Sequence, residues 1–212
     1  MGYLIVDVGV EAGVKEVLAG KFGLTILDAQ EMTSNLLAWQ GWEHLDPWST
    51  LIVLPGNGAS IVKKYIEKVD PFWLWQWPWK AFPHAKRVWI PGENPRSYVG
   101  RINPGVLVGI KTVVVIDDVI SSGETVGKLR KENKSFIPVA EWWALTWVKQ
   151  RASSTKGYSA VFAAKTVGTE EHKVPINSLS TLIERPEIAE CYARRNFGNE
   201  AKDFGEILKI FR

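Results

Sequence analysis

Apolar and polar stretches follow one another along the chain in a pattern that predicts alternating strands and helices. Short apolar runs predict strands at 3–8, 24–27, 49–54, 87–90, 113–116 and 158–167. Apolar residues at helical spacing predict helices at 11–22, 31–39 and 59–69. Residues 140–150 fit either element, because Trp143 and Trp147 are one helical turn apart while Trp142 interrupts the pattern. This order is typical of an α/β fold with a mainly parallel sheet.

The segment VVVIDDVISSGETV, residues 113–126, carries the clearest functional signal. Its four branched residues, 113–116, predict a strand buried on both faces, so Asp117 and Asp118 are expected at the carboxyl end of that strand, where α/β sheets bind ligands. The loop that follows comprises Ser121, Ser122, Gly123, Glu124 and Thr125. Small hydroxyls, a glycine that tolerates positive φ and N–H groups opening a helix are suited to a phosphate monoester. Because two adjacent carboxylates accept hydrogen bonds from a vicinal diol, the segment predicts a site for a ribose 5-phosphate.

This pattern resembles the signature of the type I phosphoribosyltransferases, which is a hydrophobic strand, two acids, two further residues and a small-residue phosphate loop ending in Thr. The resemblance implies an α/β fold, with a central mainly parallel sheet flanked by helices and a small hood subdomain. It also implies that Asp117 and Asp118 bind the ribose hydroxyls of phosphoribosyl pyrophosphate and that the loop 121–125 binds its 5′-phosphate. The alternative is a pair of acids that caps the next helix, but a cap needs only one acid and no SSGET run.

A second glycine-rich turn joins the predicted strand 49–54 to the helix 59–69. Strand, turn and helix again form a phosphate-receptive unit. The resemblance implies that this turn contacts pyrophosphate, through Gly56, Asn57 and Gly58. Many relatives carry Lys or Arg here, where this chain has Pro55, and an ordinary strand-to-helix turn is the alternative. The turn also half-matches a dinucleotide-binding fingerprint, but Ile61 stands where Gly or Ala is needed.

The polar stretch GENPRSYVGRINPG, residues 92–105, is predicted to be a long loop. Loops of this length inside compact domains are usually functional or mobile. In the family this region is a lid that closes over pyrophosphate and supplies a cation. The resemblance implies this role for Arg96, Ser97, Tyr98 and Arg101. Arginines that are simply solvated in a loop are the alternative.

The segment PFWLWQWPWKAFP, residues 71–83, is unusually aromatic. Four tryptophans recur at every second position, namely Trp73, Trp75, Trp77 and Trp79. This spacing predicts that all four indoles lie on one face of an extended segment, and Pro78 and Pro83 exclude a regular helix. The preferred interpretation is an apolar strip packed in the core or against a second subunit, which predicts a homodimer. The alternatives are a platform that stacks a base and a strip at a membrane interface.

Composition limits the remaining possibilities. The 212 residues predict a single domain, and the resemblance implies a core at about 45–167 and a hood made from the N-terminal segment and about 168–212. A formal charge of +3 is too small to argue for a nucleic-acid partner, and no uncharged apolar 20-mer predicts a membrane span. Cys191 is the only cysteine, so no intrachain disulfide is possible, and a reducing cytoplasm is the expected compartment. The three histidines have no metal-ligand spacing.

The resemblance, together with the phosphate loop and the paired acids, implies a Mg²⁺-dependent transferase that moves the 5-phosphoribosyl group from phosphoribosyl pyrophosphate to a nucleobase, with release of pyrophosphate. A purine is preferred, because the chain is rich in aromatic stacking surface. Asp117, Asp118 and Glu124 are the candidate catalytic residues, and Asp117 or Asp118 would reach the metal through water. The alternative is a regulatory protein of the same fold that senses phosphoribosyl pyrophosphate or a nucleotide without turnover. A dinucleotide-dependent oxidoreductase rests only on the half-matched glycine turn.

Overall fold

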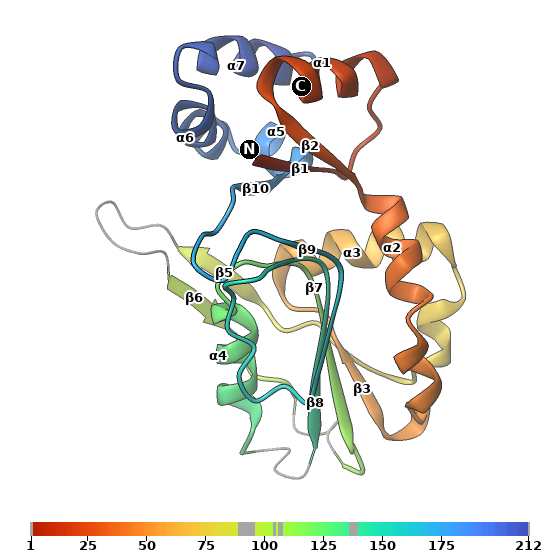
Figure 1. The fold of residues 1–212 in the computed structure, drawn as a ribbon. Helices are drawn as coiled ribbons and strands as arrows, with labels where there is room; N and C mark the ends of the chain where they lie inside the picture. Colours follow the sequence, from red (N-terminus) through yellow and green to blue (C-terminus); the bar gives the residue numbers. More distant parts are fainter. Residues whose placement is uncertain (1, 89–95, 104, 106–107, 136–139, 212) are drawn as a thin grey trace. The chain divides into compact units, whose positions relative to one another are not determined.

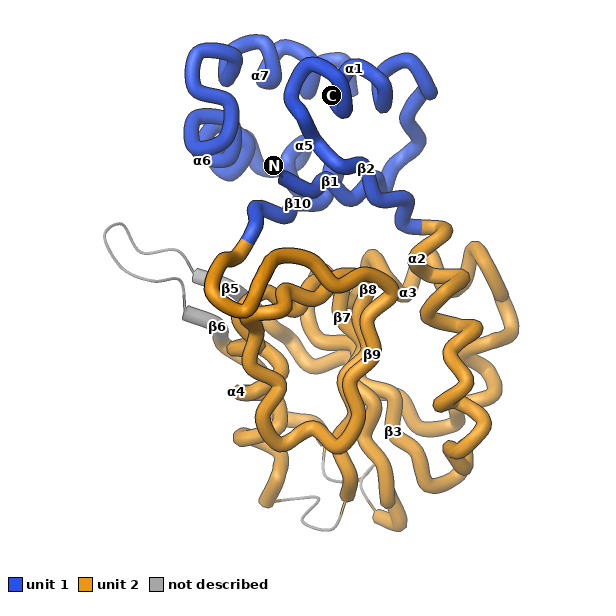
Figure 2. Tube along the Cα trace, viewed as in Figure 1, with its two compact units in different colours: residues 1–29, 174–212 blue, residues 30–173 orange. Residues whose placement is uncertain are grey.

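The computed structural model describes residues 2–88, 96–103, 105, 108–135 and 140–211, with the side chains of 86–88 and 96–97 left out. The chain divides into two compact units, coloured separately in Figure 2. One unit combines residues 1–29 with 174–212, and the other comprises residues 30–173. The first unit therefore joins both ends of the chain, while the second is continuous in sequence.

The larger unit is built on a five-stranded sheet of order β4-β3-β7-β8-β9, in which all neighbours are parallel. These strands are β3 (Thr50–Val53), β4 (Trp79–Ala81), β7 (Thr112–Ile120), β8 (Glu141–Gln150) and β9 (Ala160–Val167). The helices are α2 (Ala29–Leu37), α3 (Gly56–Val69) and α4 (Glu124–Asn133), with 3-10 turns η1 (Gln40–His44), η2 (Pro47–Ser49) and η3 (Trp73–Gln76). An antiparallel hairpin pairs β5 (Ala85–Val88) with β6 (Arg96–Val99).

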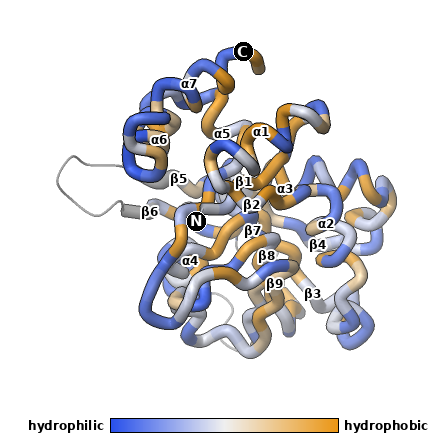
Figure 3. Tube along the Cα trace, turned by 45° about the horizontal axis from the view of Figure 1, so that its top comes forward, coloured by the Kyte–Doolittle hydropathy of each residue, from blue (hydrophilic) through white to orange (hydrophobic). Residues whose placement is uncertain are grey.

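Helices cover both faces of the sheet (Figure 1). On one face, α4 packs Val126 and Leu129 against the buried side chains of β7 and β8. On the other face, the Trp147 indole of β8 donates to Thr33 of α2 at 2.9 Å and meets the Tyr65 ring of α3. The run 113–116 in β7 is fully buried, as expected of a central strand covered on both sides. Along α3 the trace alternates between hydrophobic and hydrophilic residues, which suits a helix with one buried face (Figure 3).

The sequence predicted most of these elements, and residues 140–150 prove to contain a strand, β8. The prediction for the four tryptophans was wrong. Residues Trp73–Gln76 form a 3-10 turn, so the segment is not extended. Trp73 and Trp77 are buried against the Trp42 ring, at centroid distances of 4.8 and 5.4 Å, while Trp75 is 78% exposed.

The smaller unit has a parallel sheet of order β10-β1-β2. Its strands are β1 (Gly2–Val6), β2 (Leu24–Asp28) and β10 (Ile176–Ser178), and its helices are α1 (Ala12–Phe22), α5 (Leu179–Glu184), α6 (Pro186–Phe197) and α7 (Ala201–Lys209), with a 3-10 turn η5 (Gly198–Glu200). Leu4, Leu18 and Phe204 are fully buried in its own core. Asp7, which directly follows β1, accepts a hydrogen bond of 2.8 Å from the Ser180 N–H. It thereby provides an acceptor for an N–H group in the first turn of α5, where the helix itself has none.

No helix in the described ranges is long and apolar enough to cross a lipid bilayer.

Candidate functional site

The two acids lie within β7 and not beyond it. The sequence placed Asp117 and Asp118 after the strand, but β7 continues to Ile120, with Val119 paired to Val148 of β8. The reason is that Val119 and Ile120 are themselves branched and extend the ladder to β8. On the other side, β3 pairs with β7 only as far as Val115. The acids therefore occupy a part of β7 that projects past β3.

Successive residues of a strand point to opposite faces, and this alternation separates the two carboxyl groups. Asp118 lies on the α3 side, where a side chain at Gly58 would overlap its carboxylate. The carboxylate also accepts the Val119 N–H at 2.8 Å. The second predicted turn is thus brought directly against the second acid.

The turn itself begins α3 at Gly56, which has a φ of 68°. A side chain at Gly56 would come within 2.6 Å of the Ala85 carbonyl oxygen, so this position also requires glycine. Asn57 is exposed. No side chain caps the helix, since the residue before it is Pro55. The Gly56 N–H donates to the Pro83 carbonyl at 3.1 Å, which holds the start of the helix in place.

Asp117 lies on the α4 side and is only 7% exposed. Its Oδ1 accepts the Asp118 N–H at 3.0 Å. Burial, and then the charge of the neighbouring Asp118 carboxylate, raise the pKa of the Asp117 carboxyl group well above its ordinary value. Asp117 therefore resists ionisation.

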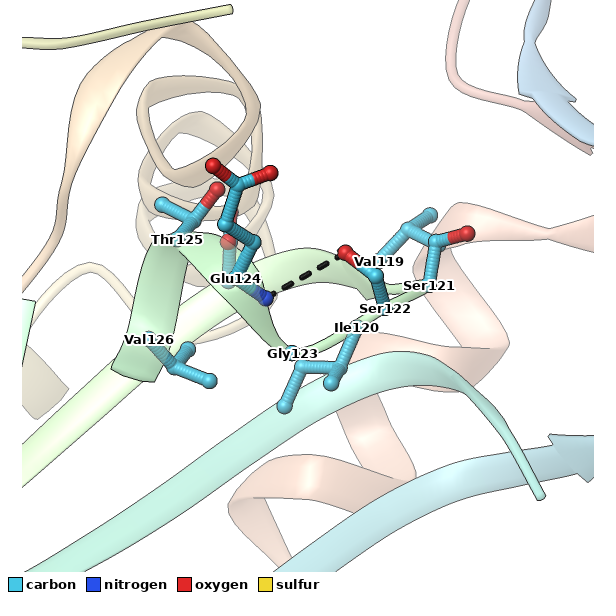
Figure 4. Close-up of a pocket in the computed structure, with 9 residues that line it drawn as sticks. Val119, Ile120, Ser121, Ser122, Gly123, Glu124, Thr125 and Val126 are labelled. Atoms are coloured by element: carbon cyan, nitrogen blue, oxygen red, sulfur yellow. Dashed lines mark hydrogen bonds between the residues drawn. The ribbon is translucent and has the colours of Figure 1, made fainter. Parts of the chain in front are cut away.

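The loop that follows β7 forms a small polar pocket together with Asp117 (Figure 4). Its volume is about 30 Å³, and it is lined by Asp117, Val119, Ile120, Ser121, Ser122, Gly123, Glu124, Thr125 and Val126. Gly123, with a φ of 81°, turns the chain into α4. The Glu124 N–H is 3.3 Å from Ser122 Oγ, a contact drawn in Figure 4. The five predicted loop residues are thus brought together around one hollow that suits a small oxyanion group.

A second loop, directly after β8, supports this pocket and was not identified from the sequence. The Ser154 N–H donates to the Ser122 carbonyl at 3.1 Å, and the Ser154 carbonyl lies against Gly123. The Tyr158 hydroxyl donates to the Val126 carbonyl at 2.8 Å. The sequence offered one signal, a polar SSTKG run before a predicted strand, but its place could not be fixed while β8 was ambiguous.

The proposed lid residues lie in and after the β5–β6 hairpin. Arg96, Ser97 and Tyr98 belong to β6, so this part of the predicted loop is a strand. Tyr98 is 56% exposed, and Arg101 is exposed as well. The side chains of Arg96 and Ser97 lie outside what the structure describes, as do residues 92–95 and 104 of the predicted loop.

Among the described residues, no group of three or more His, Cys, Asp and Glu side chains could enclose a metal ion. The donor set at this site is the pair Asp117 and Asp118, of which the first is buried and resists ionisation. Such a set does not make an all-protein cage. It does fit Mg²⁺ that is held mainly by phosphate oxygens and water, as is usual for this ion.

The raised pKa of Asp117 predicts how stability depends on pH. Because the folded state holds this proton more tightly than the unfolded chain, stability falls as pH rises from the unfolded pKa through the folded one. Asp117→Asn removes this cost while keeping the oxygen that accepts the Asp118 N–H. The variant should therefore exceed the wild type in melting temperature at neutral pH, with a gap that closes on acidification. Melting curves from pH 4 to 8 would check this, and a gap that widens on acidification would contradict it.

Comparisons with known proteins bear on the fold of the chain. No family model matches the sequence, and no curated protein matches it significantly. In structure, the chain is similar to the xanthine-guanine-hypoxanthine phosphoribosyltransferase of Helicobacter pylori, with a TM-score of 0.51 and 13% identity over 74% of this chain and 90% of that one. It is also similar to a purine phosphoribosyltransferase from Pyrococcus horikoshii, with a TM-score of 0.46 and 15% identity over 72% and 90% of the two chains. A hypothetical protein from Neisseria gonorrhoeae with bound ppGpp matches with a TM-score of 0.48 and 12% identity over 100% and 99%.

The protein thus has the α/β fold of the type I phosphoribosyltransferases, with a mainly parallel sheet flanked by helices.

Proposed function

We propose that this protein is a Mg²⁺-dependent phosphoribosyltransferase, which transfers the 5-phosphoribosyl group of phosphoribosyl pyrophosphate to a nucleobase. One observation carries the proposal. The loop 121–125 and the turn 56–58 follow neighbouring strands, β7 and β3, and the two acids lie between them, Asp117 in the loop's pocket and Asp118 against Gly58. A ligand with a phosphate at one end, a diol in the middle and a second phosphate group at the other end matches this order.

Each part of the ligand has a proposed partner. The loop 121–125 binds the 5′-phosphate through its backbone N–H groups and hydroxyls, with the N-terminus of α4 adding favourable potential. Asp118, and Asp117 when ionised, accept the ribose hydroxyls. The first turn of α3 at Gly56, Asn57 and Gly58 receives the pyrophosphate. Arg101, with Arg96 and the rest of the β6 segment, is the proposed lid.

The chemistry needs little covalent participation from the protein. As the bond at C1 of the ribose breaks, positive charge develops on the sugar and negative charge on the departing pyrophosphate. Asp117 or Asp118 would hold Mg²⁺ through water, and the ion would supply charge neutralisation at the pyrophosphate. The protein then acts by position and electrostatics, since the Asp118 carboxylate lies beside the developing positive charge. Glu124 is the proposed third carboxylate near the ribose.

A regulatory protein that senses phosphoribosyl pyrophosphate or a nucleotide is the second candidate. One observation favours it. The turn 55–58 has Pro, Gly, Asn and Gly, and so contributes no cation of its own to a pyrophosphate site. A site that binds without holding the leaving group firmly would sense its ligand and leave it intact.

Incubation of the protein with labelled phosphoribosyl pyrophosphate, Mg²⁺ and a panel of purine and pyrimidine bases separates the two candidates. An enzyme releases pyrophosphate and forms a nucleotide with at least one base, and we expect a purine. A sensor binds the labelled compound and returns it unchanged. The smaller unit, residues 1–29 with 174–212, is the proposed hood that selects the base. The same panel of bases measures how strongly the protein discriminates between them.

We also propose that the protein is a homodimer whose interface includes Trp75. Trp75 and Phe72 are 78% and 66% exposed, and their rings contact each other at 5.8 Å. Covering such rings contributes about 25 cal/mol per Å² toward association. Trp75→Glu should therefore shift light scattering at micromolar concentration from dimer to monomer, while Ile210→Glu, a charge placed on an apolar side chain that is 73% exposed in the other unit, should not. A monomeric wild type would refute the interface.

A further inference from the structure

The loop that follows β8 contacts the phosphate loop directly. The Ser154 N–H donates to the Ser122 carbonyl at 3.1 Å, and the Ser154 carbonyl lies against Gly123. Four residues later, the Tyr158 hydroxyl donates to the Val126 carbonyl at 2.8 Å. Ser122, Gly123 and Val126 all line the polar pocket shown in Figure 4. One loop therefore contacts the wall of this pocket at three residues, from the end of β7 to the first turn of α4.

Tyr158 is well placed to hold the start of α4. Its ring packs against the core and meets the Trp142 ring edge-on, at a centroid distance of 6.3 Å, so the direction of the hydroxyl is fixed. Burial raises the pKa of the Tyr158 hydroxyl, which therefore stays protonated and donates at neutral pH. Within the phosphate loop, by comparison, the Glu124 N–H and Ser122 Oγ are 3.3 Å apart, which is long for a hydrogen bond. The contact from Tyr158 is the better formed of the two.

We propose that Tyr158 is a positioning residue for the 5′-phosphate, which fixes the backbone at the start of α4 through the Val126 carbonyl and does not itself line the pocket. This inference rests on the proposed function, in which N–H groups of the loop and of the first turn of α4 bind the phosphate. N–H donors bind an anion more tightly when their directions are already set, because ordering them on binding costs conformational entropy. Without the Tyr158 hydroxyl the ligand must order this backbone itself, and its affinity falls.

The test is Tyr158→Phe, which removes the hydroxyl and keeps the ring. Calorimetric titration should show ribose 5-phosphate bound about fivefold more weakly, the equivalent of one ordinary hydrogen bond. Binding of pyrophosphate with Mg²⁺ should change by less than about twofold, because its proposed turn begins a different helix, α3, and separate sites respond independently. In turnover KM for phosphoribosyl pyrophosphate should rise while kcat stays, since the 5′-phosphate lies away from the bond that breaks.

Hydrogen exchange in the ligand-free protein gives a second readout. The amides of Glu124 and Thr125 should exchange faster in Tyr158→Phe, because the start of α4 opens more often. Tyr192→Phe is the matched control. Tyr192 is 5% exposed, and its hydroxyl has no hydrogen-bond partner among the described residues, so the variant deletes the same atom from a buried ring without breaking a bond. It should leave the affinity for ribose 5-phosphate and both exchange rates unchanged, and melting temperatures of the two variants separate lost binding from lost folding.

Each other outcome decides against the inference in a different way. If Tyr158→Phe weakens ribose 5-phosphate and pyrophosphate equally, the hydroxyl supports the structure in general and the positioning role is refuted. Weaker ribose 5-phosphate with unchanged exchange rates shows that Tyr158 contacts the ligand directly. Normal affinity for ribose 5-phosphate in Tyr158→Phe overturns the inference while the proposed function stands. A wild type that does not bind ribose 5-phosphate refutes the proposed function, and this inference with it.

Discussion

Gly123→Ala is expected to disable the phosphate loop and to destabilise the whole protein. Gly123 has a φ of 81°, which an alanine adopts only with strain, and the new methyl group would overlap the Ser154 carbonyl. The added methyl group is fixed to the backbone at position 123, and the Ser154 carbonyl is itself backbone. The backbone of one of the two loops must therefore move. We expect a loss of about 2–5 kcal/mol in the free energy of unfolding, and no measurable binding of ribose 5-phosphate. Chemical denaturation and calorimetric titration of the same sample would measure both.

Gly127→Ala provides the matched control, because it makes the same change four residues further along α4. Gly127 is exposed, and an added methyl group would meet nothing within 4 Å. Its N–H donates to the Gly123 carbonyl at 2.8 Å within a regular helical turn, which alanine keeps. This variant should gain about 0.5–1 kcal/mol and bind normally. If both variants lost stability alike, the effect would belong to α4 and not to the loop.

Replacing both acids, in Asp117→Asn with Asp118→Asn, should abolish binding of phosphoribosyl pyrophosphate while the fold persists. Each charge-assisted hydrogen bond to a ribose hydroxyl that is lost should cost about 1.5–3 kcal/mol. Together these losses lower the affinity by at least about a hundredfold, since 1.4 kcal/mol corresponds to a factor of ten. The fold should tolerate the change, because asparagine keeps the Oδ1 atoms that accept the N–H groups of Asp118 and Val119.

The single variants divide this effect between the two carboxyl groups. Burial and the neighbouring charge raise the pKa of Asp117, so its carboxyl group holds its proton at a higher pH than an ordinary aspartate does. Asp118→Asn should therefore account for the larger part of the loss at neutral pH. Asp203→Asn, at an exposed acid of the smaller unit, serves as the control. Unchanged affinity in the double variant would refute the assignment of the ribose hydroxyls to these residues.

Local patterns in the sequence were sufficient for the order of strands and helices, but not for the placement of the two acids. The run 113–116 identifies a buried strand, and Gly123 identifies a turn. The extent of β7 depends on pairing with β8, which lies more than twenty residues away and whose own pattern was ambiguous. For that reason the acids were expected beyond the strand and side by side. The alternation of the strand instead directs Asp117 to the loop pocket and Asp118 to Gly58.

The tryptophan segment shows a similar limit. A spacing of two residues is compatible with a strand, and it is equally compatible with a short turn in which Trp73 and Trp77 point the same way. Contacts with residues outside the turn determine which of these two conformations forms. Trp42 packs against both indoles, and the Lys80 ammonium donates to the Leu74 and Trp77 carbonyls at 3.0 and 2.6 Å. None of these contacts is visible in a local pattern, so the sequence could not predict which indole remains exposed.

The most direct test of the central claim is a map of backbone amide shifts, by nuclear magnetic resonance, on titration with ribose 5-phosphate. An anion bound by N–H donors perturbs those N–H groups first. The loop 121–125 should show the largest shifts, with smaller ones at Asp117 and Asp118. Addition of pyrophosphate and Mg²⁺ should then perturb residues 56–59 at the start of α3. Saturable shifts confined to other parts of the chain, or none at all, would contradict the claim that this loop is a ribose 5-phosphate site.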